Sequence, residues 1–328
     1  MAAYIVRRIA AGIVVLYVST FLLYLLVAVA GGDPLATLKA NPKVSPATIA
    51  ITRHQLGLDK PVLERYWIWF TGILHGNFGS TTTGVQVGPE LWPRMLVTLH
   101  LVIPAVILSI ILGILLGVST AVKQYSIMDH VQTGLAYLFF STPVFVIAIL
   151  LKDFLAVDVN KAAGHTILYT LGQNNPGIAG GWGLIVDEAA HTVLPVVALV
   201  LITYATWSRY QRASMLDVLN SDYVKLARAK GLARRRVLYV HALRNALIPV
   251  TTVIALDFAG LLGGTLITEI VFGWNGMGKL FFNALIGQIA PDINTIMAWM
   301  LITAAATIAF NILADISYGL LDPRIRYA

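Results

Sequence analysis

The chain contains no cysteine among its 328 residues, and charged residues make up only 12% of it. The absence of cysteine excludes disulfides, thiolate nucleophiles, iron–sulfur clusters and cysteine-ligated zinc. The charged fraction is about half of that in a soluble domain, whereas hydrophobic residues reach 58%. This composition argues against a soluble enzyme and indicates a membrane protein.

The hydrophobic residues gather in six runs of about 19 to 26 residues that contain no lysine, arginine or glutamate. A helix of about 20 residues crosses the roughly 30 Å hydrocarbon layer, whereas a barrel strand has about 10 residues of alternating polarity. We therefore expect an all-α, polytopic membrane protein with six transmembrane helices, at Ile9–Ala30, Val97–Val122, Gln132–Leu151, Ala189–Trp207, Ala246–Thr268 and Ile293–Ala314.

The first run follows Arg7 and Arg8 and ends in Ala28-Val29-Ala30, as a secretory signal peptide would. Its apolar core of about 22 residues is longer than the roughly 7 to 15 of a signal peptide, so we interpret it as a retained anchor.

Basic residues set the orientation, because lysine and arginine stay on the cytoplasmic side of short loops. With a cytoplasmic N-terminus, that side holds fourteen of the 23 basic and five of the 16 acidic residues, a net charge of +9 against −2 elsewhere. Both termini are therefore expected in the cytoplasm. No solvated basic domain remains that would bind nucleic acid.

Two stretches are expected on the outer side. The first, 31–96, includes an aromatic-rich piece, Val62–His75, that suits a helix lying in the headgroup layer. The second, Asp153–Glu188, is rich in glycine and asparagine near its centre and is interpreted as a loop.

The stretch from Trp207 to Asn245 is cytoplasmic and strongly basic, and by composition alone it needs only to fix the topology and attract anionic membrane lipid. The order of residues in this stretch predicts helices as well. An acid, then helix formers, then a glycine predict a short helix over Asp222–Gly231 outside the membrane. A second helical piece, Arg234–Asn245, leads into the fifth span, with a break near Pro249.

The order of residues from Asp222 to Pro249, D-Y-V-K-L-A-R-A-K-G-L-A-R-R-R-V-L-Y-V-H-A-L-R-N-A-L-I-P, resembles the EAA loop of ATP-binding-cassette (ABC) importer permeases, in the dipeptide/oligopeptide branch. Lys225 and Leu226 stand where the general consensus has Glu and Ala, as is common in that branch. Further motifs of the branch follow in order along nearly the whole chain: Gly32-Asp33-Pro34, Leu56-Gly57-Leu58-Asp59-x-Pro61, Arg65-Tyr66-x-x-Trp69, Gly76-Asn77-Phe78-Gly79-Ser80, Glu269-x-Val271-Phe272-x-Trp274-x-Gly276-x-Gly278 and Asp322-Pro323-Arg324-Ile325-Arg326-Tyr327.

The resemblance implies the type I ABC importer permease (MetI-like) fold. It implies an N-terminal transmembrane helix at 1–30, an extracytoplasmic segment with an interfacial helix at 31–96, and a five-helix permease core at 97–328 that carries the cytoplasmic EAA loop 207–245. The short helix would be the coupling helix, seated on an ATPase subunit through Tyr223, Lys225, Ala227, Arg228, Ala229 and Gly231.

The implied partners are a second homologous permease, two ABC ATPase subunits, an extracytoplasmic peptide-binding protein, membrane lipid and the peptide substrate. The implied location is the bacterial plasma (inner) membrane. This chain itself would bind no cofactor, because ATP and Mg²⁺ would belong to the ATPase subunits. Nickel, glutathione or another small solute is an alternative cargo.

Asp257 lies in the middle of the fifth span, where an ionisable group is costly. It would either line the translocation path or pair with a polar group across the permease interface. Glu269, at the outer end of that span, would be hydrated. Gly260 and Gly264, four residues apart, favour close helix packing against the second permease.

The segment Gly273–Leu280 nearly matches a phosphate-binding loop, but Leu280 replaces the Ser or Thr that would bind Mg²⁺. Trp274, Gly276 and Gly278 are instead expected in an outer loop that approaches the binding protein or the path, or forms a plain turn. The histidines lack metal-ligand spacing. A transporter driven by an ion gradient would need more intramembrane charges than Asp257 alone, and a membrane sensor or scaffold would not require both the outer segment and the docking helix.

Overall fold

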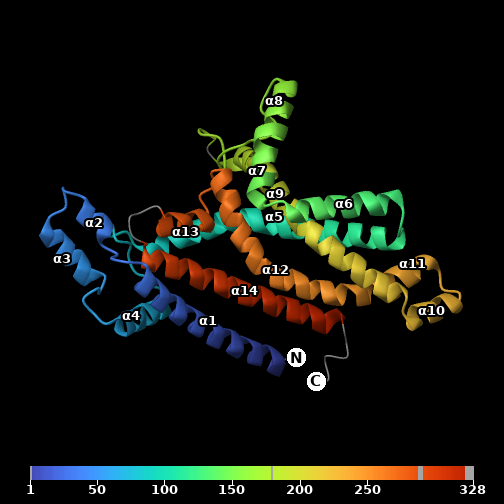
Figure 1. Ribbon diagram of the computed structural model, residues 1–328, viewed down its shortest axis with the longest axis horizontal. Helices are drawn as coiled ribbons and strands as arrows, with labels where there is room; N and C mark the ends of the chain where they lie inside the picture. Colours follow the sequence, from blue (N-terminus) through green and yellow to red (C-terminus); the bar gives the residue numbers. More distant parts are fainter. Residues whose placement is uncertain (1, 179, 287–290, 322–328) are drawn as a thin grey trace. The chain divides into compact units, whose positions relative to one another are not determined.

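The structure is a computed structural model that describes residues 2–178, 180–286 and 291–321, and its ordered elements are helices (Figure 1). Within these ranges, the strand-like pairing consists of one bridge, between Ser80 and Gln86. The chain divides into two compact units. We call 3–99 with 275–308 the outer-segment unit, and 100–274 with the chain from 309 onward the central unit. The all-α fold expected from the sequence is confirmed.

Within the described residues, five helical stretches are long and apolar enough to cross a membrane: Ile5–Ala30, Val87–Val122, Gly181–Leu219, Arg234–Phe258 and Ile293–Ile316. In order, they lie in α1 (Ala2–Ala30), α5 (Val87–Val122), α9 (Gly181–Leu219), the run from α11 (Arg234–Arg236) into α12 (Arg244–Val271), and α14 (Ile293–Leu321). A bent pair of helices supplies a sixth candidate span.

The third expected span is not one straight helix. α6 (Ile127–Ser141) and α7 (Val144–Leu150) meet at a bend of 108°. The cause is Pro143, which has no N–H to donate and disfavours the helical conformation at the residue before it. Thr142 is accordingly extended, with φ −94° and ψ 124°.

The stretch Asp153–Glu188 is largely helical, so the expectation of a loop was wrong at both its ends. The helix after α7 continues through a π-helical turn, η1 (Leu151–Ala156), into α8 (Val157–Ala163), and α9 already begins at Gly181. The loop is confined to 164–180. Gly164 starts it with φ +72°, a conformation that glycine adopts without steric cost.

Helix also extends further into the basic stretch 207–245 than expected. α9 continues to Leu219, and α11, the π-helical η2 (Val237–Leu243) and α12 follow one another without a gap. The expected break near Pro249 was wrong, since this proline lies inside α12. The irregularity lies about two to three turns earlier, where the wider π-helical turn interrupts the regular hydrogen-bond pattern.

The outer-segment unit contains α1, the short helices α2 (Ala36–Ala40) and α3 (Pro46–Gln55), α4 (Val62–Leu74) and α13 (Met277–Ile286), together with parts of α5 and α14. α4 packs on α1 through an aromatic cluster: the ring of Tyr66 lies 5.1 Å from that of Phe21 and 5.5 Å from that of Tyr24. Tyr66 and Trp69 are buried, so these two rings form core rather than the headgroup-facing surface expected of this helix; Trp67 is exposed.

Candidate functional site

The short helix predicted from the sequence after Ser221 is present as α10 (Asp222–Ala229). Asp222 lies in its first turn and Arg228 in its last, where their charges complement the helix dipole. Gly231 follows with φ +74°, and its N–H donates to the carbonyl of Arg228 at 2.9 Å. The helix therefore ends at the glycine, in the left-handed conformation that the sequence suggested.

One face of α10 is anchored in the central unit. Val224 and Ala227, three residues apart, are buried in an apolar cluster. The cluster unites α10 with the end of α5, with α9, with η2 and with the start of α12, through Val118, Ala121, Met215, Val237, Ala242 and Ala246. Burying one valine stabilises by about 1.5–3 kcal/mol, so α10 is held to these helices as part of one packed body.

The exposed residues of α10 and of the turn that follows it include five of the six residues expected to meet an ATPase: Tyr223, Lys225, Arg228, Ala229 and Gly231. The sixth, Ala227, is 7% exposed and packs inward, so its small size serves the chain's own core. A Cβ added at Gly231 would meet nothing within 4 Å, so its requirement for glycine is conformational.

Leu226 is a member of the exposed face that sequence reasoning missed. It is 56% exposed and lies three residues after the exposed Tyr223, so the two are neighbours on the helix surface. The sequence did carry a signal for this residue, because Leu226 stands where the general EAA consensus has Ala.

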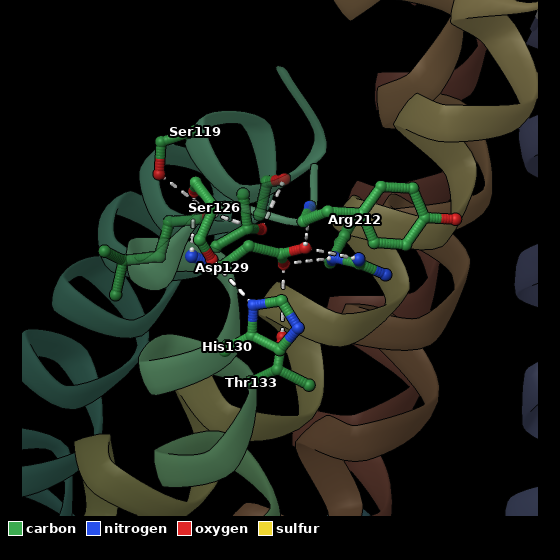
Figure 2. A network of polar contacts seen from close by, with 10 residues as sticks. Ser119, Ser126, Asp129, His130, Thr133 and Arg212 are labelled. Carbon is green, nitrogen blue, oxygen red and sulfur yellow. Dashed lines mark hydrogen bonds and ion pairs between the residues drawn. The ribbon is translucent and has the colours of Figure 1, made fainter. Parts of the chain in front are cut away.

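A buried ion pair links α6 to α9 in the central unit (Figure 2). Arg212 donates from Nε to Oδ1 of Asp129 and from Nη2 to Oδ2, both at 2.8 Å. The carboxylate also accepts from Thr133 Oγ1 at 3.3 Å. Asp129 is only 3% exposed, so this bidentate pair satisfies a charge that would otherwise be costly to bury.

The same carboxylate fixes the turn between α5 and α6. The backbone N–H of Tyr125 donates to Asp129 Oδ2 at 3.0 Å, and Ser126 caps α6 by accepting from the N–H of Asp129. Tyr125 has φ +64°, an uncommon conformation for a bulky residue. The sequence analysis used Asp129 and Arg212 only in the charge balance that sets the membrane orientation. Nothing in the local sequence marks two residues 83 positions apart as partners.

α5 and α9 approach closely at two glycines. A Cβ on Gly113 would lie 3.1 Å from Cβ of Trp207, and one on Gly117 would lie 2.6 Å from Cβ of Gln211. Gln211 is fully buried, and its amide has no hydrogen-bond partner within the described ranges. These contacts leave no room for side chains larger than hydrogen on α5.

Asp257 has a partner inside its own chain, which neither sequence interpretation foresaw. Its Oδ2 accepts from Nε1 of Trp207 on α9 at 3.0 Å. Gly260 is exposed with open space beyond it, as packing on another chain would require. Gly264 lies in α12, and its surroundings are outside what the structure describes. The expectation for Glu269 was wrong: it is fully buried rather than hydrated.

The expected outer-loop residues are all buried. Trp274, in the central unit, is 2% exposed, and its backbone N–H donates to the backbone carbonyl of Glu269 at 2.8 Å. Gly276 and Gly278 are buried in the outer-segment unit, where the N–H of Met277 donates to Thr98 Oγ1 at 2.8 Å. This burial favours the plain-turn interpretation over a surface for the binding protein.

Among the described residues, no group of three or more His, Asp or Glu side chains is placed to share a metal ion. The C-terminal motif Asp322–Tyr327 lies outside the described residues.

Comparison with known proteins places these features in a family. Residues 109–327 match the family described as "Binding-protein-dependent transport system inner membrane component", and residues 1–88 match the N-terminal part described for the same systems. The chain is 40% identical over 327 residues to the oligopeptide transport system permease protein OppB of Mycobacterium tuberculosis, with 99% of both chains covered. It is 37% identical over 340 residues to the dipeptide transport system permease protein DppB of Escherichia coli, covering 100% of this chain and 99% of that one.

Two solved structures share the fold at 14% sequence identity. One is the methionine ABC transporter MetNI in inward-facing conformations, with a TM-score of 0.53 over 71% of this chain and 96% of that chain. The other is an amino acid ABC transporter crystallised with histidines, with a TM-score of 0.50 over 70% and 93%. The helical architecture and the two matched regions together show that the chain belongs to the family of binding-protein-dependent transport system inner membrane components.

Proposed function

We propose that this chain is a permease subunit of an ATP-driven importer for oligopeptides or dipeptides, and that it forms half of the pathway together with a second, homologous permease. Its other partners are two ABC ATPase subunits, which bind ATP and Mg²⁺, and an extracytoplasmic peptide-binding protein. It resides in the bacterial inner membrane with both termini in the cytoplasm. The chain itself is not catalytic.

The observation that carries the proposal is an agreement between two features: the sequence similarity to peptide permeases over the full chain, and the exposed and buried faces of α10. Relatives aligned over 99–100% of this chain are named for oligopeptide and dipeptide transport. The helix that resembles the family's coupling element is the one with an exposed cationic and aromatic face and an anchored apolar face. Such a face suits docking on an acidic groove of a partner.

The packing of α10 suggests how ATP-driven movement reaches the spans. Displacement of α10 is carried through Val224 and Ala227 to α5, η2 and α12, because these elements share one apolar cluster. The ion pair between Asp129 and Arg212 joins α6 to α9. The central unit then moves largely as a packed body, and the translocation path opens alternately to the two sides of the membrane.

The experiment is gentle detergent purification through a tag on this chain, with mass spectrometry of the copurifying proteins, an ATPase assay and uptake of a labelled tripeptide into vesicles. We expect a second six-span permease and two ATPase chains, with uptake that requires ATP and the binding protein. Recovery of this chain alone, with uptake driven by an ion gradient, would reject the proposal.

A further inference from the structure

A polar cleft of about 940 Å³ lies within the outer-segment unit. Its walls come from residues between Leu38 and Lys60, from α4, and from the stretch 77–86. Sites for small ligands typically measure about 300–1,000 Å³. The lining is rich in hydroxyl and amide groups, and its charged members within the described residues are all potential cations: His54, Lys60 and Arg65. The cleft therefore suits a polar ligand with negative charge.

Two of these three cationic side chains already have acidic partners. Lys60 Nζ lies 3.0 Å from Oε1 of Glu64, and His54 Nδ1 lies 3.1 Å from Oδ2 of Asp59. Arg65 differs, because its Nε is shielded from solvent and has no hydrogen-bond partner in the described part of the chain. Arg65 is thus the guanidinium left to meet an incoming anion.

A second unmatched donor lies one helical turn further along α4. Trp69 is 6% exposed, and its Nε1 likewise lacks an acceptor among the described residues. Residues four apart share one face of a helix, so Arg65 and Trp69 are neighbours, and both line the cleft. Buried N–H groups without an acceptor are rare and destabilising. Because both residues line the cleft, a ligand bound there is placed to supply the missing acceptor.

An acid in an adjoining pocket does not supply that acceptor. Asp292 lines this smaller pocket, which also includes Arg65. Its Oδ2 accepts from Thr295 Oγ1 at 3.0 Å, and burial raises the pKa of its carboxyl, which favours the neutral form. Among the described residues, no Asp or Glu lines the cleft itself.

We propose that this cleft binds a carboxylate group of a peptide, with Arg65 and Trp69 as the donors. A carboxylate has two acceptor oxygens and a charge that matches a guanidinium, so one group can serve both donors. Hydroxyl and amide side chains such as Thr48 and Gln55 are available for the peptide backbone. The inference rests on the proposed peptide import and adds to it a substrate contact on the outer segment.

The test measures binding of trialanine and of trialanine amide to the purified permease–ATPase complex in nanodiscs, without binding protein or ATP, by isothermal titration. Wild type should bind the free acid about tenfold more tightly than the amide. Arg65→Gln should abolish this preference. Trp69→Phe keeps a ring against Tyr24 and Tyr66 and should weaken acid binding by about threefold, since only the donor is lost.

Lys43→Gln is the matched control, because it removes the same charge from an exposed position of the same unit that does not line the cleft. It should leave the preference unchanged. Equal affinity for acid and amide in wild type, equal losses in Lys43→Gln and Arg65→Gln, or no binding at all would overturn the site. A separate pull-down measures capture of the binding protein; if Arg65→Gln lowers this capture and leaves the preference for the free acid unchanged, the peptide is overturned as the source of the carboxylate.

ATP-driven uptake of trialanine by the wild-type importer separates this inference from the proposed function. Failed uptake rejects the proposed function. Normal uptake together with no preference for the free acid rejects only the cleft.

Discussion

Individual charged residues of α6, α9 and α10 differ in what they do for the fold. Asp129 is buried and bound by two nitrogens of Arg212, whereas Asp222 is fully exposed and meets Lys225 at 3.3 Å. An exposed pair of the second kind contributes about 0–1 kcal/mol. The buried pair of Asp129 and Arg212 fixes a turn and joins two helices, because its geometry is bidentate and it is largely shielded from water.

Replacing Asp129 by Asn should destabilise the protein. Arg212 would lose its counter-charge, and breaking a buried pair costs about 3–5 kcal/mol; because 27% of the Arg212 side chain is exposed, we expect about 1–3 kcal/mol here. The measurement is the midpoint of thermal unfolding in detergent, followed by size-exclusion chromatography. Asp217→Asn, at an exposed position of α9, is the control. Equal midpoints for the two variants would show that the pair is dispensable.

At the scale of elements, α5 and α9 depend on glycine where they approach most closely. Gly117→Ala would place a Cβ 2.6 Å from that of Gln211 and 2.7 Å from the carbonyl oxygen of Ser208, so the helices must separate. Overpacking of this kind costs about 1–3 kcal/mol. We expect a lower unfolding midpoint in the same thermal assay.

The matched control is Gly134→Ala in α6, where an added Cβ meets nothing within 4 Å. Alanine is favoured over glycine in a helix by about 0.5–1 kcal/mol, so this variant should be as stable as wild type or more so. A loss of stability in both variants would mean that the contact between α5 and α9 is not the cause.

The two faces of α10 should respond differently to the same substitution. Leu226→Asp changes an exposed residue, so the variant should fold as wild type does. Fewer ATPase subunits should copurify with it. Val224→Asp puts an unpaired charge into the apolar cluster and should lower stability by several kcal/mol. The measurements are the copurified ATPase-to-permease ratio and the thermal midpoint. Full ATPase recovery with Leu226→Asp would exclude this face as the docking surface.

For the whole molecule, the absence of cysteine allows a direct test of membrane orientation. Single cysteines at Ile127 and Val85, which are 85% and 48% exposed, report the two sides. In intact spheroplasts, a membrane-impermeant maleimide should label Val85→Cys but not Ile127→Cys, because the excess of basic residues keeps the turn between α5 and α6 in the cytoplasm. Permeabilised cells should show both labelled. The reverse pattern would invert the topology.

The position of most helices along the chain follows from the order of residues. The six apolar runs predict the spanning helices, because a helix satisfies its backbone polar groups within one run and these runs are too long and too uniformly apolar for barrel strands. The short docking helix and its end at Gly231 follow from an acid, helix formers and a glycine, since helix start and stop signals act over a few residues.

The tertiary structure decided what depends on contacts between distant positions. It turned Ala227 inward, gave Asp257 a partner in Trp207 and Asp129 one in Arg212, and buried Tyr66 and Trp69 against α1. The sequence by itself determined where helices form, because the hydrogen bonds of a helix are local. Which face of each helix is buried, and which polar groups pair or stay unpaired, depends on side chains that meet only when the helices pack.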